Sequence, residues 1–424
     1  MNISNLRARE ILDSRGIPTI ETEITLEDGT KAKGAVPSGA STGTTEVLEM
    51  RDDDKARYFG DGVLNAVSKV ETEIKTAIVG MNYDTQADLD NFLILLDGTL
   101  NKSKLGGNSI LSVSMAFARA MAISTKQPLY QYFAKAYFGD EYESKFKIEM
   151  PQSMVLLMEG GKHGNWATDF QEYMVVPKKE RFPKYSDVVR AGAEIFKATH
   201  DALLKRGYSA TVGFEGAFAP HEIRSNTEAF EIMLEGVELA GYKVGEEIVL
   251  ALDMAASEFY DRETGKYNLK REGLILSSEE WLEKQADWFR QYPIWSIEDT
   301  LFEEDWDTWV RLVDQFGSTM QIVGDDLLTT NVERIRKAIT ADAANAVLVK
   351  INQIGTITET IEAIKMAKSV GWGAVMSHRG GETNDDLIAD LAIGTMSGQT
   401  KFGGPDRGER LAKYNRLTEI ELGW

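Results

Sequence analysis

The chain has 424 residues, of which 43% are hydrophobic, a length and composition that favour two domains over one and supply a large core. It contains no cysteine, which excludes disulfides, thiolate metal sites and cysteine nucleophiles. The 47 basic and 67 acidic residues give a net charge of −20, which argues against a nucleic-acid-binding protein because such a protein needs a basic face.

The first residues, MNISNLRAREIL, lack the apolar core of a signal peptide, and no run reaches the roughly 18 apolar residues of a membrane span. We therefore expect a soluble, cytoplasmic protein. An acidic protein can still bind small anions where its few basic groups converge, so the net charge does not identify the ligand.

An antiparallel hairpin is expected near the N-terminus. Apolar or β-branched residues alternate with polar ones over 20–26, which is typical of a half-buried strand. Asp28-Gly29 supplies a turn, and residues 31–36 return as the second strand. The next segment, VPSGASTGTTE, consists of small residues without a large apolar anchor, so we expect a mobile loop, with a plain surface linker as the alternative.

Three helical patterns follow, at 63–79, at 85–96 and from Asn108 or Ser109 to about Met121. Strands followed by helices, rather than alternating with them, indicate an α+β domain. We place its end in the charged, weakly periodic stretch 139–147. The prediction is an α+β N-terminal domain over 1–140 and a second domain over 141–424.

Short apolar runs that end in single polar residues recur through the second domain, as in IVLALD, IWSIED, MQIVGDD, AVLVKIN and GAVMSHR. Their spacing is that of successive βα units of about 30 residues. A longer gap contains FYDRETGKYNLK, which reads as an inserted hairpin. The pattern predicts a TIM-like eight-stranded α/β barrel with strands near 151–157, 169–176, 209–214, 248–253, 294–298, 320–325, 346–351 and 373–378.

The polar residues at these strand ends should meet at one mouth, because the carboxyl ends of parallel barrel strands converge where active sites lie. Asp253, Glu298 and Asp325 would there face Lys350 and His378. A single strand-end carboxylate is more often a capping group, but three at adjacent strand ends favour a metal site. Their hard oxygen ligands suit Mg²⁺ rather than zinc.

Nine motifs stand along the chain in this order: REILDSRG, VPSGASTG, FQEYM, EGAFAP, ALDMAASEFY, VGDDL, VKINQIGT, SHRGGET and GERLAKYN. In these motifs the chain resembles the enolase (phosphopyruvate hydratase) family over essentially its whole length. The resemblance implies the enolase fold and a lyase that reversibly converts 2-phospho-D-glycerate to phosphoenolpyruvate and water. It also implies two Mg²⁺ ions per active site and a homo-oligomer, either a dimer or an assembly of dimers.

By this resemblance, Lys350 removes the C2 proton and Glu215, across the cavity, delivers a proton to the departing C3 hydroxyl. Glu172, at the expected end of the second strand, and His163 support the proton-donating side. We also expect nearby cations, Lys401 among them, to depress the pKa of Lys350 and so supply a neutral amine. The metal ligands would be Asp253, Glu298 and Asp325, with Ser41 of the loop completing a second magnesium site.

The remaining positions that the resemblance assigns contact substrate: Gln171, His378, Arg379, Gly380, Lys401 and Ser41. Arg379 has the fork geometry that suits a phosphate, and Lys401 would lie on the carboxylate side. The resemblance assigns no role to His200 or His221, which we interpret as structural.

The sequence departs from the family pattern at positions that cluster around the site: Ile17, Glu159, Lys162, Gly164, Phe214, Ala217, Thr300 and Gly380. Gly380 stands where a serine usually follows the arginine. Two alternatives therefore stay open, an enolase-fold enzyme acting on a different acid with an α-proton, and a non-catalytic binding protein. Retention of Lys350 and Glu215 argues against the second, because a purely structural role needs neither.

Overall fold

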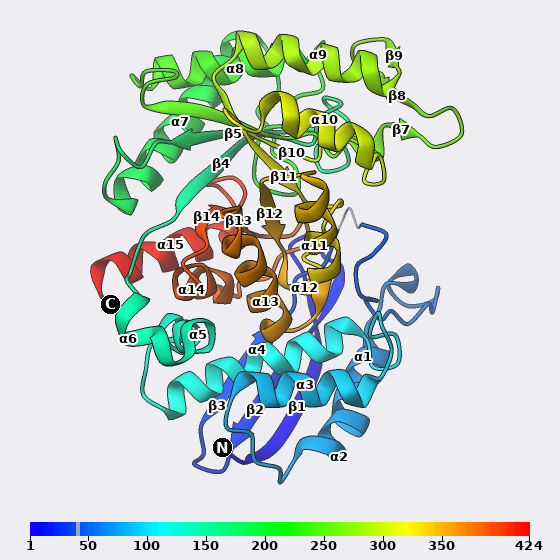
Figure 1. The fold of residues 1–424 in the computed structure, drawn as a ribbon, viewed down its shortest axis with the longest axis vertical. Helices are drawn as coiled ribbons and strands as arrows, with labels where there is room; N and C mark the ends of the chain where they lie inside the picture. The colour runs from blue at the N-terminus through cyan, green and yellow to red at the C-terminus, as the bar shows by residue number, and fades with distance from the viewer. Residues whose placement is uncertain (40–42) are drawn as a thin grey trace.

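An antiparallel sheet with its own helices stands below a closed barrel in the computed structural model, which describes residues 1–39 and 43–424 (Figure 1). The strands of this sheet are β1 (Ile3–Leu12), β2 (Pro18–Leu26) and β3 (Lys31–Ala35). Along β2, Ile20, Thr22, Ile24 and Leu26 are buried while the three residues between them are partly exposed, which confirms the predicted alternation. β1 was not predicted.

The three predicted N-terminal helices are confirmed. The first is one helical stretch with a π-helical centre, and the second begins with a capping box between Thr85 and Asp88. The third packs on the sheet closely, because a Cβ at Gly34 would lie 2.6 Å from the Cβ of Met115. The helices are η1 (Tyr58–Gly60), α1 (Leu64–Lys69), η2 (Val70–Ile74), α2 (Lys75–Ile78), α3 (Gln86–Asp97), α4 (Gly107–Ser124), α5 (Leu129–Phe138), η3 (Gly139–Glu141) and α6 (Tyr142–Lys145).

The barrel has eight strands, in the spatial order β6-β10-β11-β12-β13-β14-β4-β5. β5 runs antiparallel to both of its neighbours, and all other neighbouring pairs are parallel. The strands are β4 (Gln152–Glu159), β5 (Glu172–Pro177), β6 (Ile248–Asp253), β10 (Ile294–Glu298), β11 (Gln321–Gly324), β12 (Ala346–Val349), β13 (Gly373–Ser377) and β14 (Gly398–Lys401).

One predicted strand is wrong and one was missed. Residues 209–219 form a turn outside the barrel, with isolated bridges from Val212 and Met158 to Phe218. The eighth strand is β14, whose sequence GQTK contains no apolar run. Its buried Thr400 is hydrogen-bonded to Ser153 of β4 at 2.7 Å between the hydroxyl oxygens, so side-chain polar pairing replaces apolar packing there.

Alternate residues of the strands fill the barrel interior, where Leu156, Met174, Val323, Leu348 and Val375 form one apolar cluster. The helices outside the ring bury its other face. They are α7 (Tyr185–Lys205), α8 (Asn226–Leu239), η4 (Ala256–Glu258), α9 (Ser278–Gln291), α10 (Trp306–Phe316), α11 (Val332–Ala341), α12 (Ile351–Ile354), α13 (Ile357–Ser369), α14 (Leu387–Gly394) and α15 (Gly408–Leu422).

The hairpin predicted after β6 is present and gains a third strand. β7 (Tyr260–Asp261), β8 (Lys266–Leu269) and β9 (Leu274–Leu276) form a small antiparallel sheet (Figure 1). In the described part of the chain, no helix combines the length and the apolar character needed to cross a lipid bilayer. The domain boundary near residue 140 stays a prediction.

Candidate active site

The polar residues predicted at the strand ends lie together at one mouth of the barrel, and all but Lys350 are fully buried. Each is either the last residue of a parallel strand or within one residue of its end, so the topology alone brings them together. They are Asp253 (β6), Glu298 (β10), Asp325 (β11), Lys350 (β12), His378 (β13) and Lys401 (β14).

Glu172 and Gln171 reach the same mouth from the opposite direction. The prediction that they end the second strand is wrong, since β5 begins at Glu172. Because β5 is antiparallel to its neighbours, its start lies beside their ends, and Glu172 pairs with Glu159 of β4 and Asp253 of β6. A residue at the start of a strand therefore serves the same site as residues at the ends of the others.

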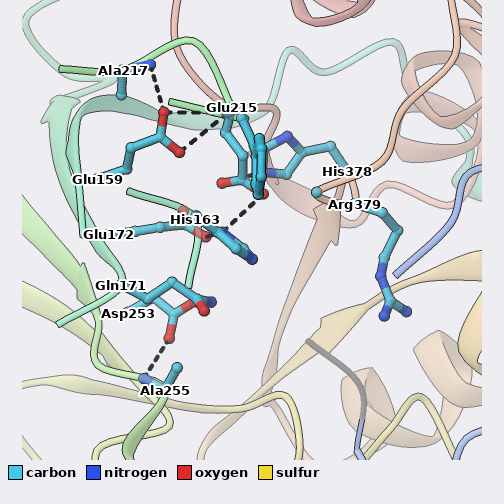
Figure 2. Close-up of polar contacts among 12 residues, drawn as sticks. Glu159, His163, Gln171, Glu172, Glu215, Ala217, Asp253, Ala255, His378 and Arg379 are labelled. Carbon is cyan, nitrogen blue, oxygen red and sulfur yellow. Dashed lines mark hydrogen bonds and ion pairs between the residues drawn. The ribbon is translucent and has the colours of Figure 1, made fainter. Parts of the chain in front are cut away.

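Two loops complete the acidic side of the mouth (Figure 2). His163 lies in the β4–β5 loop, and its Nδ1 is 3.2 Å from Oε1 of Glu215 and 4.0 Å from Oε1 of Glu172. Glu215 belongs to the turn at 209–219, and its Oε2 is 3.6 Å from Nε2 of His378. The predicted residues Glu172, Glu215, His163 and His378 are thus brought together.

The protonation of the carboxyls on this side is unequal. Burial and the neighbouring Glu215 raise the pKa of Glu172 well above its usual range. Burial would also raise the pKa of Glu215, but His163 and His378 outweigh it and the pKa falls well below its usual range. With the side chains in these positions, Glu172 binds a proton more strongly than Glu215 does.

Lys401 stands at the centre of three carboxylates. Its Nζ lies 3.0 Å from Oδ2 of Asp253, 2.8 Å from Oε1 of Glu298 and 3.2 Å from Oε1 of Glu172. Burial opposes the charged amine, but Asp253 and its two neighbours outweigh burial and raise the pKa of Lys401 well above its usual range. Lys401 is therefore the resident counter-ion of this acidic cluster.

Lys350 has a single close acidic partner, the carboxylate of Asp325, which accepts a hydrogen bond from its Nζ. Burial lowers the pKa of the amine, but Asp325 raises it more, so the net pKa of Lys350 is raised. The expected depression of this pKa is wrong for this arrangement of side chains, because the nearest charge to the amine is negative. A neutral amine requires that this ion pair opens.

Arg379 is held by a segment of the N-terminal domain. Its Nη1 lies 3.1 Å from Oε2 of Glu46 and 3.0 Å from Oδ1 of Asn352, and its Nη2 lies 3.2 Å from Oε1 of Glu46. Glu46 is the last residue of the segment VPSGASTGTTE, which was predicted as a loop. Ser41, predicted as a metal and substrate ligand, lies outside the described residues.

The space between these side chains is small. It measures about 10 Å³, which is about the volume that a single water requires. A small-molecule substrate therefore enters only if the side chains that line this space move apart. The lining residues are His163, Gln171, Glu172, Glu215, Lys350, Ser377, His378, Arg379, Gly380 and Lys401.

Comparison with protein-family models matches both halves of the chain. Residues 3–133 match the N-terminal domain of enolase, and residues 147–423 match the enolase C-terminal TIM barrel domain. The chain belongs to the enolase family. The mixed barrel and the small antiparallel N-terminal sheet are the enolase fold, and the family supports an enolase-fold lyase that acts on a small molecule.

The donor set of this enolase-family protein fits a divalent metal. Asp253, Glu298 and Asp325 supply only oxygen ligands, and burial together with Asp253 raises the pKa of Glu298 well above its usual range, which marks a site short of positive charge. Oε1 of Gln171, beside Asp253, is buried without a hydrogen-bond partner among the described residues, so a further oxygen is available.

The tightest groups of possible ligand atoms are not those predicted. In the described ranges, three groups have their atoms within 4.8 Å of one another, and Asp253 and Glu298 are in none of them. Those two carboxylates instead form ion pairs with Lys401, and Asp325 forms an ion pair with Lys350. The groups are Glu159–His163–Glu215, Glu172–Glu215–His378 and Asp299–Asp325–Asp326.

Several residues that hold the site in place were not predicted from the sequence. The carboxylate of Asp299 accepts the backbone N–H of Asp325 at 2.9 Å and of Asp326 at 2.7 Å. Glu159 likewise accepts the N–H of Glu215 at 3.2 Å and of Ala217 at 3.2 Å (Figure 2). A buried acid next to a predicted ligand is the signal that could have indicated Asp299; nothing local indicated that Glu159 reaches the turn at 209–219.

Proposed function

We propose that this enolase-family protein is a Mg²⁺-dependent lyase that reversibly dehydrates 2-phospho-D-glycerate to phosphoenolpyruvate. One observation carries the proposal: an amine, Lys350, and a carboxyl, Glu215, line the same small buried cavity. Abstraction of a proton next to a carboxylate and loss of a hydroxyl from the adjacent carbon need one base and one acid within a single site.

In this mechanism Asp253, Glu298 and Asp325 hold the metal, and Ser41 contributes to a second magnesium site. Bound Mg²⁺ supplies the positive charge that stabilises the carboxylate dianion left when the C2 proton is removed. Lys350 separates from Asp325 and loses its proton to solvent, and the neutral Nζ then accepts the C2 proton.

Glu215 delivers a proton to the departing C3 hydroxyl. Since its own pKa is lowered, Glu215 must first receive that proton from a neighbour. His163 is placed for this exchange, with Nδ1 at 3.2 Å from Glu215 and 4.0 Å from Glu172, whose pKa is raised. Glu172 is therefore the proton store and Glu215 the acid that acts on the substrate.

The phosphate and the carboxylate of the substrate are bound by basic side chains of the same cavity. Arg379 exchanges its contact with Glu46 for a bidentate contact with the phosphate. Lys401 exchanges its contact with Glu298 for the substrate carboxylate. Gln171 and His378 contribute further polar contacts from the cavity wall.

A second candidate is an enolase-fold enzyme that acts on a different acid with an α-proton. Gly380 favours it, because this residue lines the cavity beside Arg379 without a side chain where a hydroxyl would contact a phosphate. The abstraction step by Lys350 would be the same, and only the group recognised by the 379–380 segment would differ.

The test is an absorbance assay for phosphoenolpyruvate formation from 2-phosphoglycerate, with Mg²⁺ and after its removal by a chelator. We expect turnover only with the metal, and recovery when the metal is restored. No turnover in either condition, combined with solvent exchange of the α-proton of another carboxylic acid, would instead establish the second candidate. We also predict a cytoplasmic location, which cell fractionation would test. We predict a homo-oligomer, either a dimer or an assembly of dimers, which light scattering would test.

A further inference from the structure

One fully buried guanidinium lies behind the mouth and contacts two segments of the site. Arg410, near the start of α15, is 0% exposed, and its Nη1 donates to Nδ1 of His378 at 2.7 Å and to the carbonyl of Arg379 at 2.5 Å. Its Nη2 donates to the carbonyls of Gly380 at 2.9 Å and of Phe214, next to Glu215, at 3.1 Å. Arg410 thus joins the turn that carries Glu215 to the segment that carries His378.

The contact with His378 determines where the imidazole carries its proton. A guanidinium has only N–H donors and no acceptor, so Nδ1 of His378 must be the acceptor in this pair. A neutral imidazole that accepts at Nδ1 carries its hydrogen on Nε2. Burial, reinforced by Arg410, lowers the pKa of His378 well below its usual range against the opposing effect of Glu215, which keeps the ring neutral.

The hydrogen fixed in this way points into the cavity. Nε2 of His378 is 3.6 Å from Oε2 of Glu215, and within the described residues neither atom has a hydrogen-bond partner. Both residues line the cavity. An N–H at this place offers a hydrogen bond to the ionised Glu215 or to a substrate oxygen between the two groups, whereas the other tautomer would present a lone pair to a carboxylate.

We propose that Arg410 is a positioning residue that locks His378 in its Nε2–H tautomer and so keeps a hydrogen-bond donor facing Glu215. The consequence for catalysis rests on the proposed function, in which Glu215 transfers a proton to the departing hydroxyl. The assignment of the tautomer does not rest on the proposed function. It follows from the contact, in the free protein, between Nδ1 of His378 and a guanidinium, which can only donate.

The first test is therefore independent of turnover. The full-length protein has four histidines, so ¹⁵N-histidine labelling gives four imidazole spin systems, and His200→Gln and His221→Gln remove the two outside the site. We expect the two-bond ¹⁵N–¹H pattern of His378 to show a protonated Nε2 and an unprotonated Nδ1 at neutral pH without substrate. A protonated Nδ1, alone or in a cationic ring, would overturn the proposal.

The second test uses Arg410→Gln, with Arg407→Gln as a matched control. Arg407 also ties the Glu215 turn, through the carbonyl of Gly213 at 3.0 Å, but no contact between it and His378 is found among the described residues. Arg410→Gln should convert the His378 spectrum to a mixture of tautomers, and Arg407→Gln should leave it unchanged. An unchanged spectrum in folded Arg410→Gln would overturn the proposal, and if that variant fails to fold, the wild-type spectrum still decides.

A double-mutant cycle with His378→Gln separates the effect of Arg410 on the His378 tautomer from the effect of its contacts with backbone carbonyls. Glutamine at 378 offers an N–H donor but has no tautomers, so in that background Arg410→Gln removes only the carbonyl contacts. We expect Arg410→Gln to lower kcat roughly tenfold or more in the wild-type background, with a smaller effect on KM. In the His378→Gln background the same substitution should lower kcat distinctly less. Equal losses in both backgrounds would assign Arg410 a structural role only. If 2-phosphoglycerate is not turned over at all, the proposed function fails while the spectrum still reports on Arg410.

Discussion

The ammonium of Lys350 and the carboxylate of Asp325 form a buried ion pair between the ends of two adjacent strands, β12 and β11. The Asp325 carboxylate holds the proton on the amine, which is the opposite of what a base requires. In the proposed mechanism, catalysis therefore begins with the separation of that pair. The same side chains would form a stable ion pair in one state and act as base and metal ligand in the other.

Lys350→Ala should abolish dehydration and also the exchange of the substrate C2 hydrogen with solvent. Removal of a general base lowers the rate by about 10²–10⁴, and we expect the upper end because the proton next to a carboxylate is weakly acidic. The variant also leaves Asp325 without its counter-ion, which destabilises the fold by about 3–5 kcal/mol in comparable buried pairs. Exchange is measured by NMR in D₂O after folding has been verified, with the exposed Lys365→Ala as control. Persistent exchange in Lys350→Ala would assign the base to another group.

Glu215→Gln should separate the two proton transfers. Glutamine retains the shape of the side chain but cannot deliver a proton, so phosphoenolpyruvate formation should fall by about 10²–10⁴ while C2 exchange continues. Both are followed in one sample by absorbance and NMR. Glu222→Gln, an exposed acid near the same turn, should leave both unchanged. Loss of exchange together with dehydration would show that the two steps are concerted or that the site has collapsed.

Gly380→Ser tests which acid the site recognises. If a hydroxyl at this position donates to the phosphate, it adds a charge-assisted hydrogen bond worth about 1.5–3 kcal/mol, or ten- to a hundredfold in affinity. We expect a lower KM for 2-phosphoglycerate with little change in kcat, the pattern of a contact made equally in the ground and transition states. Gly408→Ser, where the nearest atom to an added Cβ is 4.0 Å away, is the control. An unchanged or raised KM would indicate a phosphate pocket rebuilt around the glycine.

Glu159→Gln should change the pH dependence of stability. Burial and Glu215 raise the pKa of Glu159 from 4.5 to about 8 in the folded protein. Between these pH values the folded state binds the proton more strongly than the unfolded state, so the contribution of Glu159 to the free energy of unfolding decreases as pH rises. The slope approaches about 1.4 kcal/mol per pH unit for one group.

Glutamine cannot ionise, yet its Oε1 can accept both backbone N–H groups that Oε1 of Glu159 accepts now. Relative to the wild type, Glu159→Gln should therefore gain stability from pH 5.5 to 8.5 in urea unfolding. Glu149→Gln is the control, because the hydrogen bond from Lys179 lowers the pKa of Glu149. This group is ionised in both the folded and the unfolded protein throughout that range, so the stability difference between wild type and Glu149→Gln should not change with pH. A stability difference between wild type and Glu159→Gln that does not change with pH would show that Glu159 is ionised in the folded protein.

The parts of the fold that the sequence predicted are those with a local physical signature. Alternating burial in β2, the helical pattern at 85–96 and the apolar runs before Asp253 and Glu298 each arise from neighbours in the chain. β14 could not be predicted in this way, because its GQTK is stabilised by pairing with distant strands and by the Thr400–Ser153 hydrogen bond.

The sequence predicted which residues form the site, but it did not predict the direction of the pKa shift of Lys350. The strand-end pattern and the family motifs identified Lys350, Asp325 and Lys401, and the structure brings these residues together. The direction of the Lys350 pKa depends on which charge lies nearest to its amine, and that is a three-dimensional property. For the same reason Arg410 could not be assigned a role, since it lies more than thirty positions along the chain from the histidine whose tautomer it fixes.

The short strand β14 joins β13 to β4, and it is the last of the eight strands in the chain. Until residues 398–401 are in place, the sheet has two unpaired edges, and Lys401 is absent from among its three carboxylates. During synthesis on the ribosome, the mouth of the barrel therefore cannot assemble before nearly the entire chain has emerged. A nascent chain that stops short of β14 exposes unpaired β-edges and leaves Asp253 and Glu298 without the amine of Lys401, so it should be prone to aggregation until β14 is added.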